Sequence, residues 1–384
     1  MNEKNMTENQ KLRVTILDLK WSYGIEQVSV QIYRQLEKYG PVSMLGAAEA
    51  TFAEAEKIAP SGSYAQMLSA FANPSIYLRI LRHLRRRRTD VLYIASPHAA
   101  NFPIAVLCRL FTRVYVISHV HDPQCFGRRS VSSIADALAY LQGKVSHRVY
   151  CWGSAIRDAI AARFRIPKAK VAVFPHGPGQ STPADSARTP ERPPLKHFAM
   201  IGSIHPRKGI DVFLEAARRF NAEYKNRNVG FLLAGAGDLE NYRSLIDAVP
   251  NLTVKNRFIP DGEVNELLQT SYGLVLPYVG GMMQTSFIAI AYGNGCPVIV
   301  SRNGSMFEEV VHGSTGYIVE RSDPSGIAEA MMRLCDEETG REFSENCLSY
   351  YRTRFSWEAI AKQMHDDMCR ELNTRFAPRA EAAA

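Results

Sequence analysis

The stretch from Phe198 to Ile210, FAMIGSIHPRKGI, decides the fold of the second half of this chain. Its apolar start predicts a buried strand that ends at Gly202, and a short basic loop then leads into a helix from Asp211. Backbone N–H groups at such a helix start, with a nearby lysine, can hold a phosphate. The alternative is an ordinary turn in which Arg207 and Lys208 are merely solvated. Cations at this position oppose the helix dipole, which favours a bound anion.

Apolar runs alternate with amphipathic helical segments along both halves of the chain. In the first half the predicted strands cover residues 12–18, 91–96, 114–120, 148–152 and 171–174, and the predicted helices cover 28–39 and 154–164. In the second half strands are predicted at 198–201, 230–234, 274–276, 298–300 and 317–319, with helices at 211–220, 263–269, 284–293 and 325–335. This alternation predicts an α/β protein with two doubly wound, Rossmann-like domains.

A polar segment that contains four prolines, residues 179–194, separates the two series and reads as a linker. The predicted organisation is an N-terminal domain over 1–178, a linker over 179–195, a C-terminal domain over 196–354, a long helix over 355–373 and a disordered tail over 374–384. Ligands of such sheets bind beyond the carboxyl ends of the strands, and the cleft between the two domains is the expected site.

Composition narrows the class of protein. With 46% hydrophobic and 22% charged residues the chain is globular, and it has no apolar run of the roughly 18 residues that a membrane span needs. The polar N-terminus shows no secretory signal. Seven scattered cysteines without a CxxC pattern suit a reducing compartment. A cytoplasmic protein is therefore expected.

Positive charge is concentrated in the first half. Residues 1–190 carry 25 Lys and Arg against 13 Asp and Glu, and the densest run, Arg79 to Arg88, interleaves arginines with apolar residues. This run predicts a basic amphipathic helix that can lie on an anionic membrane surface. A solvated helix end is the alternative. The chain shows no basic groove with stacking aromatic residues, so no nucleic acid partner is expected.

The second half resembles retaining GT-B glycosyltransferases, in particular glycosyltransferase family 4 (group 1). The resemblance rests on five segments in the family's order: IGSIHPRKGIDVFLEA, FLLAGAGDL, FIPDGEVNELLQTSYGLVLPY, YGNGCPVIVSRNGSMFEEVVHGSTGYIVE and FSWEAIAKQM. They are similar to the family's phosphate loop, glycine turn, base-pocket segment, A-x-G-x-P-V-I region and terminal helix. That helix is expected to cross back onto the N-terminal domain.

The first half resembles the family less closely. VYVISHVHDP is similar to the strand that ends in a histidine meeting the donor sugar, which would be His121. Gly24 lies where the family's first glycine loop approaches the diphosphate, although the usual double glycine is absent.

Two departures from the family's pattern stand out. Ser203 occupies the position of the arginine that usually follows the first glycine, so Arg207 or His205 is left to supply the second cation. The usual Glu-x7-Glu pair is replaced by Met282 and Ile290. The stretch around Gln284 resembles a subgroup that carries Gln-Ser in this place.

The resemblance implies that Lys208, Arg207 and His121 are catalytic. The donor-binding residues that it implies are Gly24, Gly202, Ser203, His205, Gly209, Gly235, Phe258, Ile259, Gln284, Thr285, Ser286 and Glu309. For the hydroxyls of residues 285 and 286 helix capping is the alternative, and for Glu309 it is a first-turn acid favoured by the helix dipole.

The function implied is transfer of a sugar, with retention, from a nucleotide-diphosphate sugar to a glycan or lipid-linked acceptor in polysaccharide or glycolipid biosynthesis. No cofactor and no metal is expected, because the chain has no Asp-x-Asp motif and fixed cations can stabilise the leaving diphosphate. The enzyme would work in the cytoplasm, peripherally at the inner face of the membrane. The alternatives are a non-catalytic GT-B scaffold protein and a GT-B sugar-nucleotide epimerase.

Overall fold

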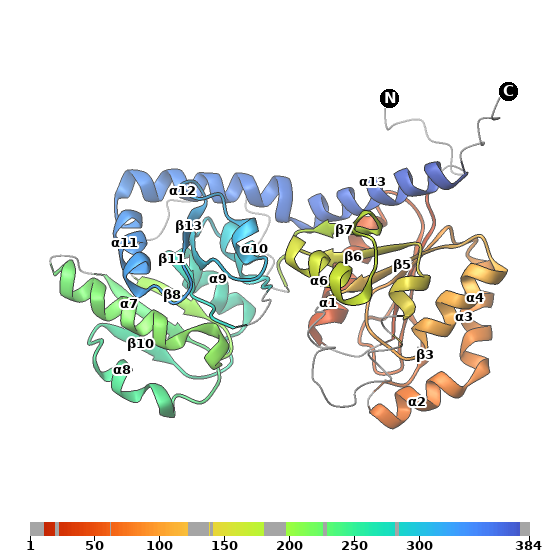
Figure 1. Cartoon of the computed structure of the whole chain (residues 1–384), viewed down its shortest axis with the longest axis horizontal. Helices are drawn as coiled ribbons and strands as arrows, with labels where there is room; N and C mark the ends of the chain where they lie inside the picture. The colour runs from red at the N-terminus through yellow and green to blue at the C-terminus, as the bar shows by residue number, and fades with distance from the viewer. Residues whose placement is uncertain are drawn as a thin grey trace. The chain divides into compact units, whose positions relative to one another are not determined.

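The structure of the chain, a computed structural model, describes residues 11–19, 23–61, 63–121, 138, 141–179, 197–225, 229–280 and 284–376 (Figure 1). It divides into two units. Unit 1 comprises residues 1–152, 156–174 and 357–384, and unit 2 comprises residues 153–155 and 175–356. The predicted linker from residue 180 onward and the tail from residue 377 lie outside the described residues.

Unit 1 is built on a seven-stranded sheet in the order β3-β2-β1-β4-β5-β6-β7, and every neighbouring pair is parallel. Its strands are β1 (Val14–Asp18), β2 (Val42–Ala47), β3 (Ala55–Ala59), β4 (Val91–Ile94), β5 (Tyr115–Val120), β6 (Arg148–Trp152) and β7 (Val171–Phe174). Its helices are α1 (Tyr23–Leu36), α2 (Tyr64–Ala72), α3 (Pro74–Arg86), α4 (Asn101–Phe111), α13 (Trp357–Phe376) and, from residue 156, α6 (Ser154–Phe164).

Unit 2 holds a six-stranded parallel sheet in the order β10-β9-β8-β11-β12-β13. Its strands are β8 (His197–Ile201), β9 (Gly230–Ala234), β10 (Leu252–Lys255), β11 (Ser271–Leu276), β12 (Val298–Ser301) and β13 (Gly316–Val319). Its helices are α7 (Ile210–Glu223), α8 (Arg243–Asp247), α9 (Asp261–Gln269), α10 (Phe287–Gly293), α11 (Pro324–Leu334) and α12 (Glu337–Tyr350). The predicted pair of doubly wound α/β domains is confirmed.

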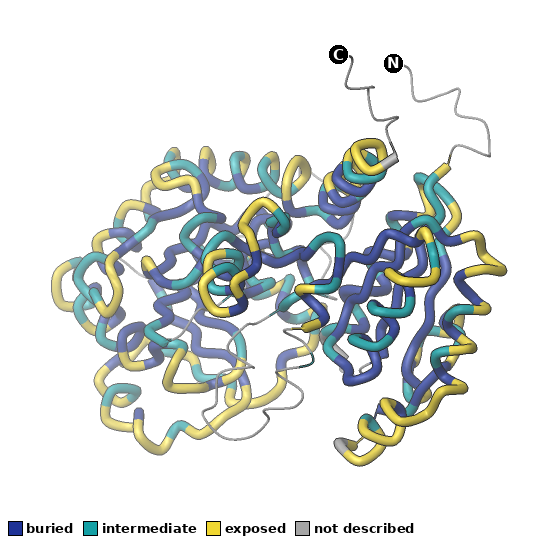
Figure 2. The backbone as a smooth tube through the Cα atoms, turned by 45° about the vertical axis from the view of Figure 1, so that its right-hand side comes forward, coloured by how far each residue is buried: buried dark blue, intermediate teal, exposed yellow. Residues whose placement is uncertain are grey.

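The strands form because they are buried on both faces. In β1 all five residues are buried, and in β8 all but the first are. Figure 2 shows buried backbone in the interior and exposed backbone along the outside. Continuous apolar runs of this length are typical of parallel strands covered by helices on both sides. Among the described residues, no helix has both the length and the apolar character needed to cross a bilayer.

Two predicted boundaries were wrong. α1 begins at Tyr23, so Gly24 lies in its first turn and not in a loop. α10 begins at Phe287 and not at Gln284, because the amide of Phe287 bonds the hydroxyl of Thr285 in a local turn at the helix start. Strands β2 and β3 were not predicted, since their apolar runs are short and interrupted by glycine or charge.

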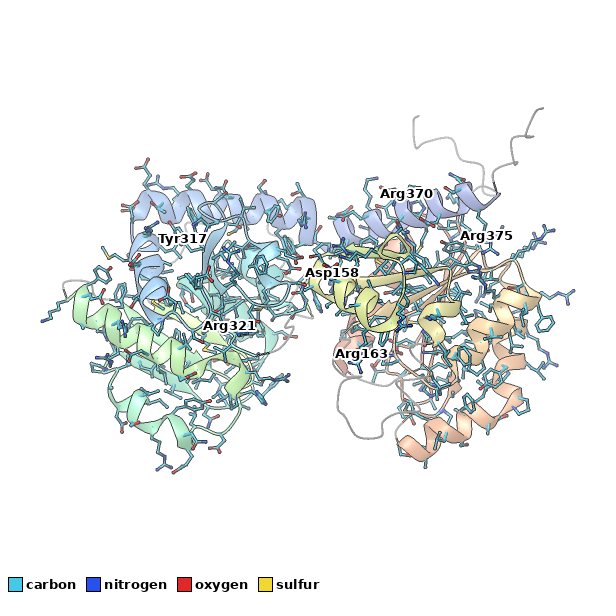
Figure 3. All side chains as sticks on the ribbon, in the orientation of Figure 1. Asp158, Arg163, Tyr317, Arg321, Arg370 and Arg375 are labelled. Carbon is cyan, nitrogen blue, oxygen red and sulfur yellow. The ribbon has the colours of Figure 1, made fainter. Side chains whose placement is uncertain are left out.

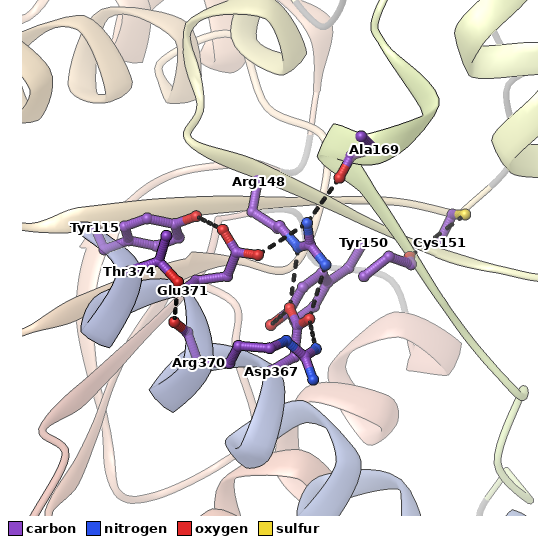
Figure 4. A network of polar contacts seen from close by, with 10 residues as sticks. Tyr115, Arg148, Tyr150, Cys151, Ala169, Asp367, Arg370, Glu371 and Thr374 are labelled. Atoms are coloured by element: carbon purple, nitrogen blue, oxygen red, sulfur yellow. Dashed lines mark hydrogen bonds and ion pairs between the residues drawn. The ribbon is translucent and has the colours of Figure 1, made fainter. Parts of the chain in front are cut away.

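The long terminal helix α13 belongs to unit 1 and is held there by a buried charge network (Figure 4). Arg148 of β6 donates two hydrogen bonds to Asp367, at 2.8 and 3.1 Å, and the Tyr150 hydroxyl donates to the same carboxylate at 2.9 Å. Arg148 also pairs with Glu371 at 3.0 Å, and Glu371 accepts the hydroxyl of Tyr115. Asp367 is 4% exposed, so its charge depends on these partners.

We expect Arg148→Ala to lower the free energy of unfolding by about 3 kcal/mol, because Asp367 would keep only the exposed Arg370 and the Tyr150 hydroxyl, and Glu371 would lose its arginine partner. Lys38→Ala is the matched control, since Lys38 pairs with Glu358 of the same helix at an exposed site and should cost less than about 1 kcal/mol. Urea denaturation followed by circular dichroism measures both. Equal losses in the two variants would contradict a buried anchor.

Candidate functional site

The sheet of unit 2 reverses its strand order between β8 and β11, which are neighbours in the sheet although β9 and β10 lie between them in sequence. Loops that leave the carboxyl ends of strands at such a switch point form the usual ligand site of an open α/β sheet. Here these loops are the segment from Gly202 to Gly209, after β8, and the segment from Pro277 to Gly280, after β11.

Lys208 lies at this switch point and folds back over the start of its own loop. A Cβ atom at Gly202 would lie 2.8 Å from the Lys208 ammonium nitrogen, and the backbone there has φ +128°, so only glycine fits. The ammonium nitrogen also lies 5.2 Å from the ring centre of Tyr278 and 5.8 Å from that of Phe287. Among the described residues no carboxylate forms an ion pair with Lys208.

The backbone conformation of Gly209 fixes the position of Lys208. Its φ is +71°, and a Cβ atom there would lie 2.1 Å from the carbonyl oxygen of Pro277. The carbonyl of Arg207 accepts the amide of Val279 at 2.9 Å, which ties the two loops together. The predicted phosphate loop is thus locked onto the end of β11, directly before α7.

The other predicted loop residues lie at its rim. Ser203, His205 and Arg207 are exposed, and the amide of Arg207 donates to the His205 ring. Gly235 follows β9 with its backbone against the carbonyl of Gly202. Phe258 and Ile259 follow β10, and they differ: Phe258 is 75% exposed and Ile259 is buried.

Gln284, Thr285 and Ser286 precede α10 and adjoin the lysine site through Phe287. The side chain of Ser286 does not cap the helix, whereas Thr285 accepts the amide of Phe287 at 3.3 Å. Gln284 points elsewhere, because its amide nitrogen donates to Glu309 at 2.8 Å. Among the described residues, its amide oxygen has no hydrogen-bond partner.

Glu309 lies in the short 3₁₀ helix Met306–Glu309, so the alternative of a first-turn acid stands, but its side chain is buried and only 3% exposed. Its Oε1 accepts from Gln284 and from the backbone amide of His176, at 2.8 and 3.2 Å, while its Oε2 has no hydrogen-bond partner in the part of the chain that the structure describes. Burial raises the pKa of the Glu309 carboxyl to about 8, and the two donated hydrogen bonds only partly oppose that rise. At neutral pH this group therefore retains its proton.

In unit 2 the structure places the predicted residues Gly202, Lys208 and Gly209 at the switch point with Phe287 beside them, and it joins Gln284 to Glu309 in a separate contact. Thr285 and Ser286 directly precede Phe287 in the chain. Sequence reasoning missed the two aromatic rings beside Lys208, although Tyr278 ends the apolar run of β11 and could have been noticed there. It also missed the backbone amide of His176, because no sequence signal marks a main-chain donor.

His121 lies in unit 1, at the end of β5, with both ring nitrogens engaged. Its Nε2 bonds the carbonyl of Ala95 at 2.6 Å, and its Nδ1 accepts the indole N–H of Trp152 at 3.2 Å. A neutral imidazole protonated on Nε2 satisfies both contacts. The role of His121 toward a donor sugar stays a prediction, as does that of Gly24.

Among the described residues, no group of three or more His, Cys, Asp or Glu side chains could hold a metal ion.

Two family models cover most of the chain. Residues 23–178 match the model described as Glycosyltransferase Family 4, and residues 196–337 match the model described as Glycosyl transferases group 1. The chain has a GT-B fold, and its homologues are glycosyltransferases.

Among curated proteins, a D-inositol 3-phosphate glycosyltransferase of Corynebacterium urealyticum is 26% identical over 215 residues, which are 51% of this chain and 50% of that protein. The chain therefore spans about half the length of this relative. A UDP-Gal:α-D-GlcNAc-diphosphoundecaprenol α-1,3-galactosyltransferase of Escherichia coli is 24% identical, with 70% of this chain and 72% of that protein covered.

Solved structures of low sequence identity share the fold. A glycosyltransferase from Rickettsia africae superposes with a TM-score of 0.68 at 15% identity, covering 94% of this chain and 99% of that one. HepE from Anabaena, solved in complex with UDP, gives a TM-score of 0.67 at 14% identity, covering 94% and 100%.

The buried Glu309 carboxyl predicts a pH dependence of stability. The unfolded chain releases this proton near pH 4.5 and the folded chain near pH 8, so the unfolded state binds fewer protons in between. The free energy of unfolding should therefore fall as the pH rises through this window, by at most about 5 kcal/mol.

Denaturation at several pH values tests this expectation. Glu309→Gln should remove that slope, whereas Glu308→Gln, at the neighbouring residue, should keep it. A Glu309→Gln protein with the parent's pH profile would place the titrating group elsewhere.

Proposed function

We propose that the chain is a retaining, metal-independent glycosyltransferase that uses a nucleotide-diphosphate sugar. The observation that carries this proposal is the position of Lys208. Lys208 is a half-buried cation at the switch point of unit 2, in the loop from Gly202 to Gly209 that precedes α7. Among the described residues it lacks a carboxylate partner.

Transfer of a sugar requires stabilisation of the diphosphate as its bond to the anomeric carbon breaks. The Lys208 ammonium would face the negative charge that develops on the leaving group, and the backbone N–H groups at the start of α7 would bind the phosphate oxygens. The rings of Tyr278 and Phe287 hold the ammonium in place before the donor arrives. Fixed charges of this kind need no reorganisation during the reaction.

The donor sugar would meet Gln284 and Glu309. Both have a buried oxygen for which the described residues offer no hydrogen-bond partner, and Glu309 keeps its proton at neutral pH, since burial raises its pKa to about 8. An amide oxygen accepts a hydrogen bond from a sugar hydroxyl, and a protonated carboxyl donates one. This pair would take over contacts that the missing Glu-x7-Glu residues make in the family.

The acceptor is a glycan or a lipid-linked intermediate in polysaccharide or glycolipid biosynthesis. The names of the relatives support this proposal, because one acts on an inositol phosphate and another on a diphosphoundecaprenol-linked sugar. Retention of the anomeric configuration rests on the family resemblance.

Contact with an anionic membrane surface at the cytoplasmic face forms part of the proposal, but only some of the arginines from Arg79 to Arg88 are available for it. Arg79 donates to the carbonyls of residues 57 and 58, and Arg86 pairs with Glu56 at 3.2 Å. Arg82 and Arg85 are exposed, and one helical turn before Arg82 lies Leu78, which is 51% exposed. The outward stripe of α3 is therefore basic and apolar.

Replacing the key cation tests the mechanism. Lys208→Ala should lower kcat/KM by about 10²–10³-fold, which corresponds to about 2–4 kcal/mol of transition-state stabilisation. Arg207→Ala, at the exposed rim, is the matched control and should cost less than about tenfold. Sugar transfer to a natural acceptor is the assay. Near-parental turnover by Lys208→Ala would show that the phosphate site has been misplaced.

Donor binding is a second test. Thermal unfolding with UDP-, GDP- and ADP-sugars should show a rise in Tm for at least one nucleotide, and the rise should be lost in Lys208→Ala. Turnover should be insensitive to EDTA. No stabilisation by any nucleotide would refute the proposal, and donor binding without any turnover would favour the scaffold protein. Product formed from the donor alone would indicate an epimerase.

A further inference from the structure

The amino ends of β4, β5, β6 and β7 lie side by side, because these strands are parallel neighbours in one sheet. With about 4.8 Å between strands, the four starts fall within roughly 15 Å. Cations precede three of them: Arg87 and Arg88 before β4, Arg113 before β5 and Lys170 before β7.

These cations have no acidic partners. Among the described residues, neither these four side chains nor Arg109, in the last turn of α4, forms an ion pair with a carboxylate. Asp90, which lies at the same edge, is already paired with Arg13. The charges also affect one another, because Arg109 adds to the effect of burial in lowering the pKa of Lys170 to about 8. Arg109 donates to the carbonyl of residue 145 at 3.2 Å and Lys170 to that of residue 144 at 2.7 Å, so backbone carbonyls hold these two side chains but do not neutralise them. Among the described residues, the positive charge of this edge therefore has no carboxylate partner.

Two large apolar side chains lie among these cations. Leu110 and Phe111 close α4 and are 68% and 73% exposed, between Arg109 and Arg113 in sequence. A Phe or Leu this exposed is unfavourable in water, and exposed apolar groups amid cations mark an interaction site. We define the amino-edge surface as Arg87, Arg88, Arg109, Leu110, Phe111, Arg113 and Lys170.

We propose that the amino-edge surface docks unit 1 on an anionic bilayer, with Leu110 and Phe111 inserted among the lipid headgroups and the surrounding cations bound to their phosphates. The inference deepens the membrane contact proposed above, and it names α4, which that proposal did not include. α3 and α4 lie side by side (Figure 1), so the outward stripe of α3 adjoins this surface.

A bilayer fits better than another anionic partner for a physical reason. A nucleic acid or a soluble phosphate would use the cations alone and would leave the two apolar side chains in water. A lipid interface accepts both, since apolar side chains enter the acyl boundary while arginines remain at the headgroups. Each cation near such a surface strengthens binding about fivefold, and salt screens that contribution.

Co-sedimentation of the full chain with vesicles tests the proposal. The parent should bind phosphatidylcholine vesicles that contain phosphatidylglycerol at low salt and bind pure phosphatidylcholine weakly. Arg109→Ser with Arg113→Ser should weaken binding to the anionic vesicles about 30-fold. Leu110→Ser with Phe111→Ser should weaken it about tenfold, and this loss should persist at high salt.

Matched controls show whether a loss of binding is specific to the amino-edge surface or follows from removing any exposed arginine or apolar side chain. Arg321→Ser with Arg341→Ser removes two exposed arginines of unit 2 (Arg321 is labelled in Figure 3), and Val311→Ser removes an apolar side chain that is 44% exposed. Both should bind like the parent. The double variant Arg82→Ser with Arg85→Ser measures how much α3 contributes to binding of the anionic vesicles. If only the α3 variant lost binding, or if every variant bound equally, the assignment to α4 would be overturned.

A conservative variant reports insertion directly. Tryptophan in Phe111→Trp should shift its emission to shorter wavelength with anionic vesicles and be quenched by brominated lipid. If a water-soluble quencher reduced the fluorescence of this tryptophan and brominated lipid did not, insertion would be refuted. These readouts need neither donor nor acceptor, so a negative result leaves the transferase proposal intact, and failure of the transferase assays leaves this one intact.

Discussion

The backbone path of the loop from Gly202 to Gly209, which folds Lys208 back over the start of that loop, is the constraint on which the candidate site depends. It requires glycine at 202, because φ there is +128°, and it requires glycine at 209, because a Cβ atom there would lie 2.1 Å from the carbonyl oxygen of Pro277. It also requires the sheet order, since Pro277 and Tyr278 come close only because β11 lies beside β8. A half-buried cation that loses hydration and gains only aromatic faces is incompletely satisfied, so an anion would complete it.

The buried acid Glu309 avoids an unpaired charge by staying protonated. Glu309 is more deeply buried than Lys208 and keeps its proton, because burial raises its pKa and among the described residues no cation pairs with it directly. Glu309 therefore adds no negative charge to unit 2 at neutral pH, and among the described residues Lys208 has no carboxylate partner. Such a balance favours a diphosphate over a neutral ligand, and it is set by burial and not by the number of acidic residues in the sequence.

The fold was predictable because parallel strands are continuous apolar runs, as in LRVTILD and FAMI. The phosphate loop was predictable because glycine and lysine mark it in the sequence. The pairing of Gln284 with Glu309 was not, because it joins residues from different loops, and the backbone amide of His176 carries no side-chain signal at all. The position of Gly24 was missed because a helix start and a loop share the same residue preferences.

The arginine run from Arg79 to Arg88 shows why linear charge density is a poor guide to a surface. The helical period turns Arg79 and Arg86 toward β3, where carbonyls and Glu56 bind them, and leaves Arg82 and Arg85 outward. Residues far apart in sequence, such as Arg113 and Lys170, meet at one edge because parallel strands start together. Cations gathered in this way by topology form a surface that no window of the sequence displays. Because no carboxylate of the described residues neutralises them, their charge can attract an anionic partner.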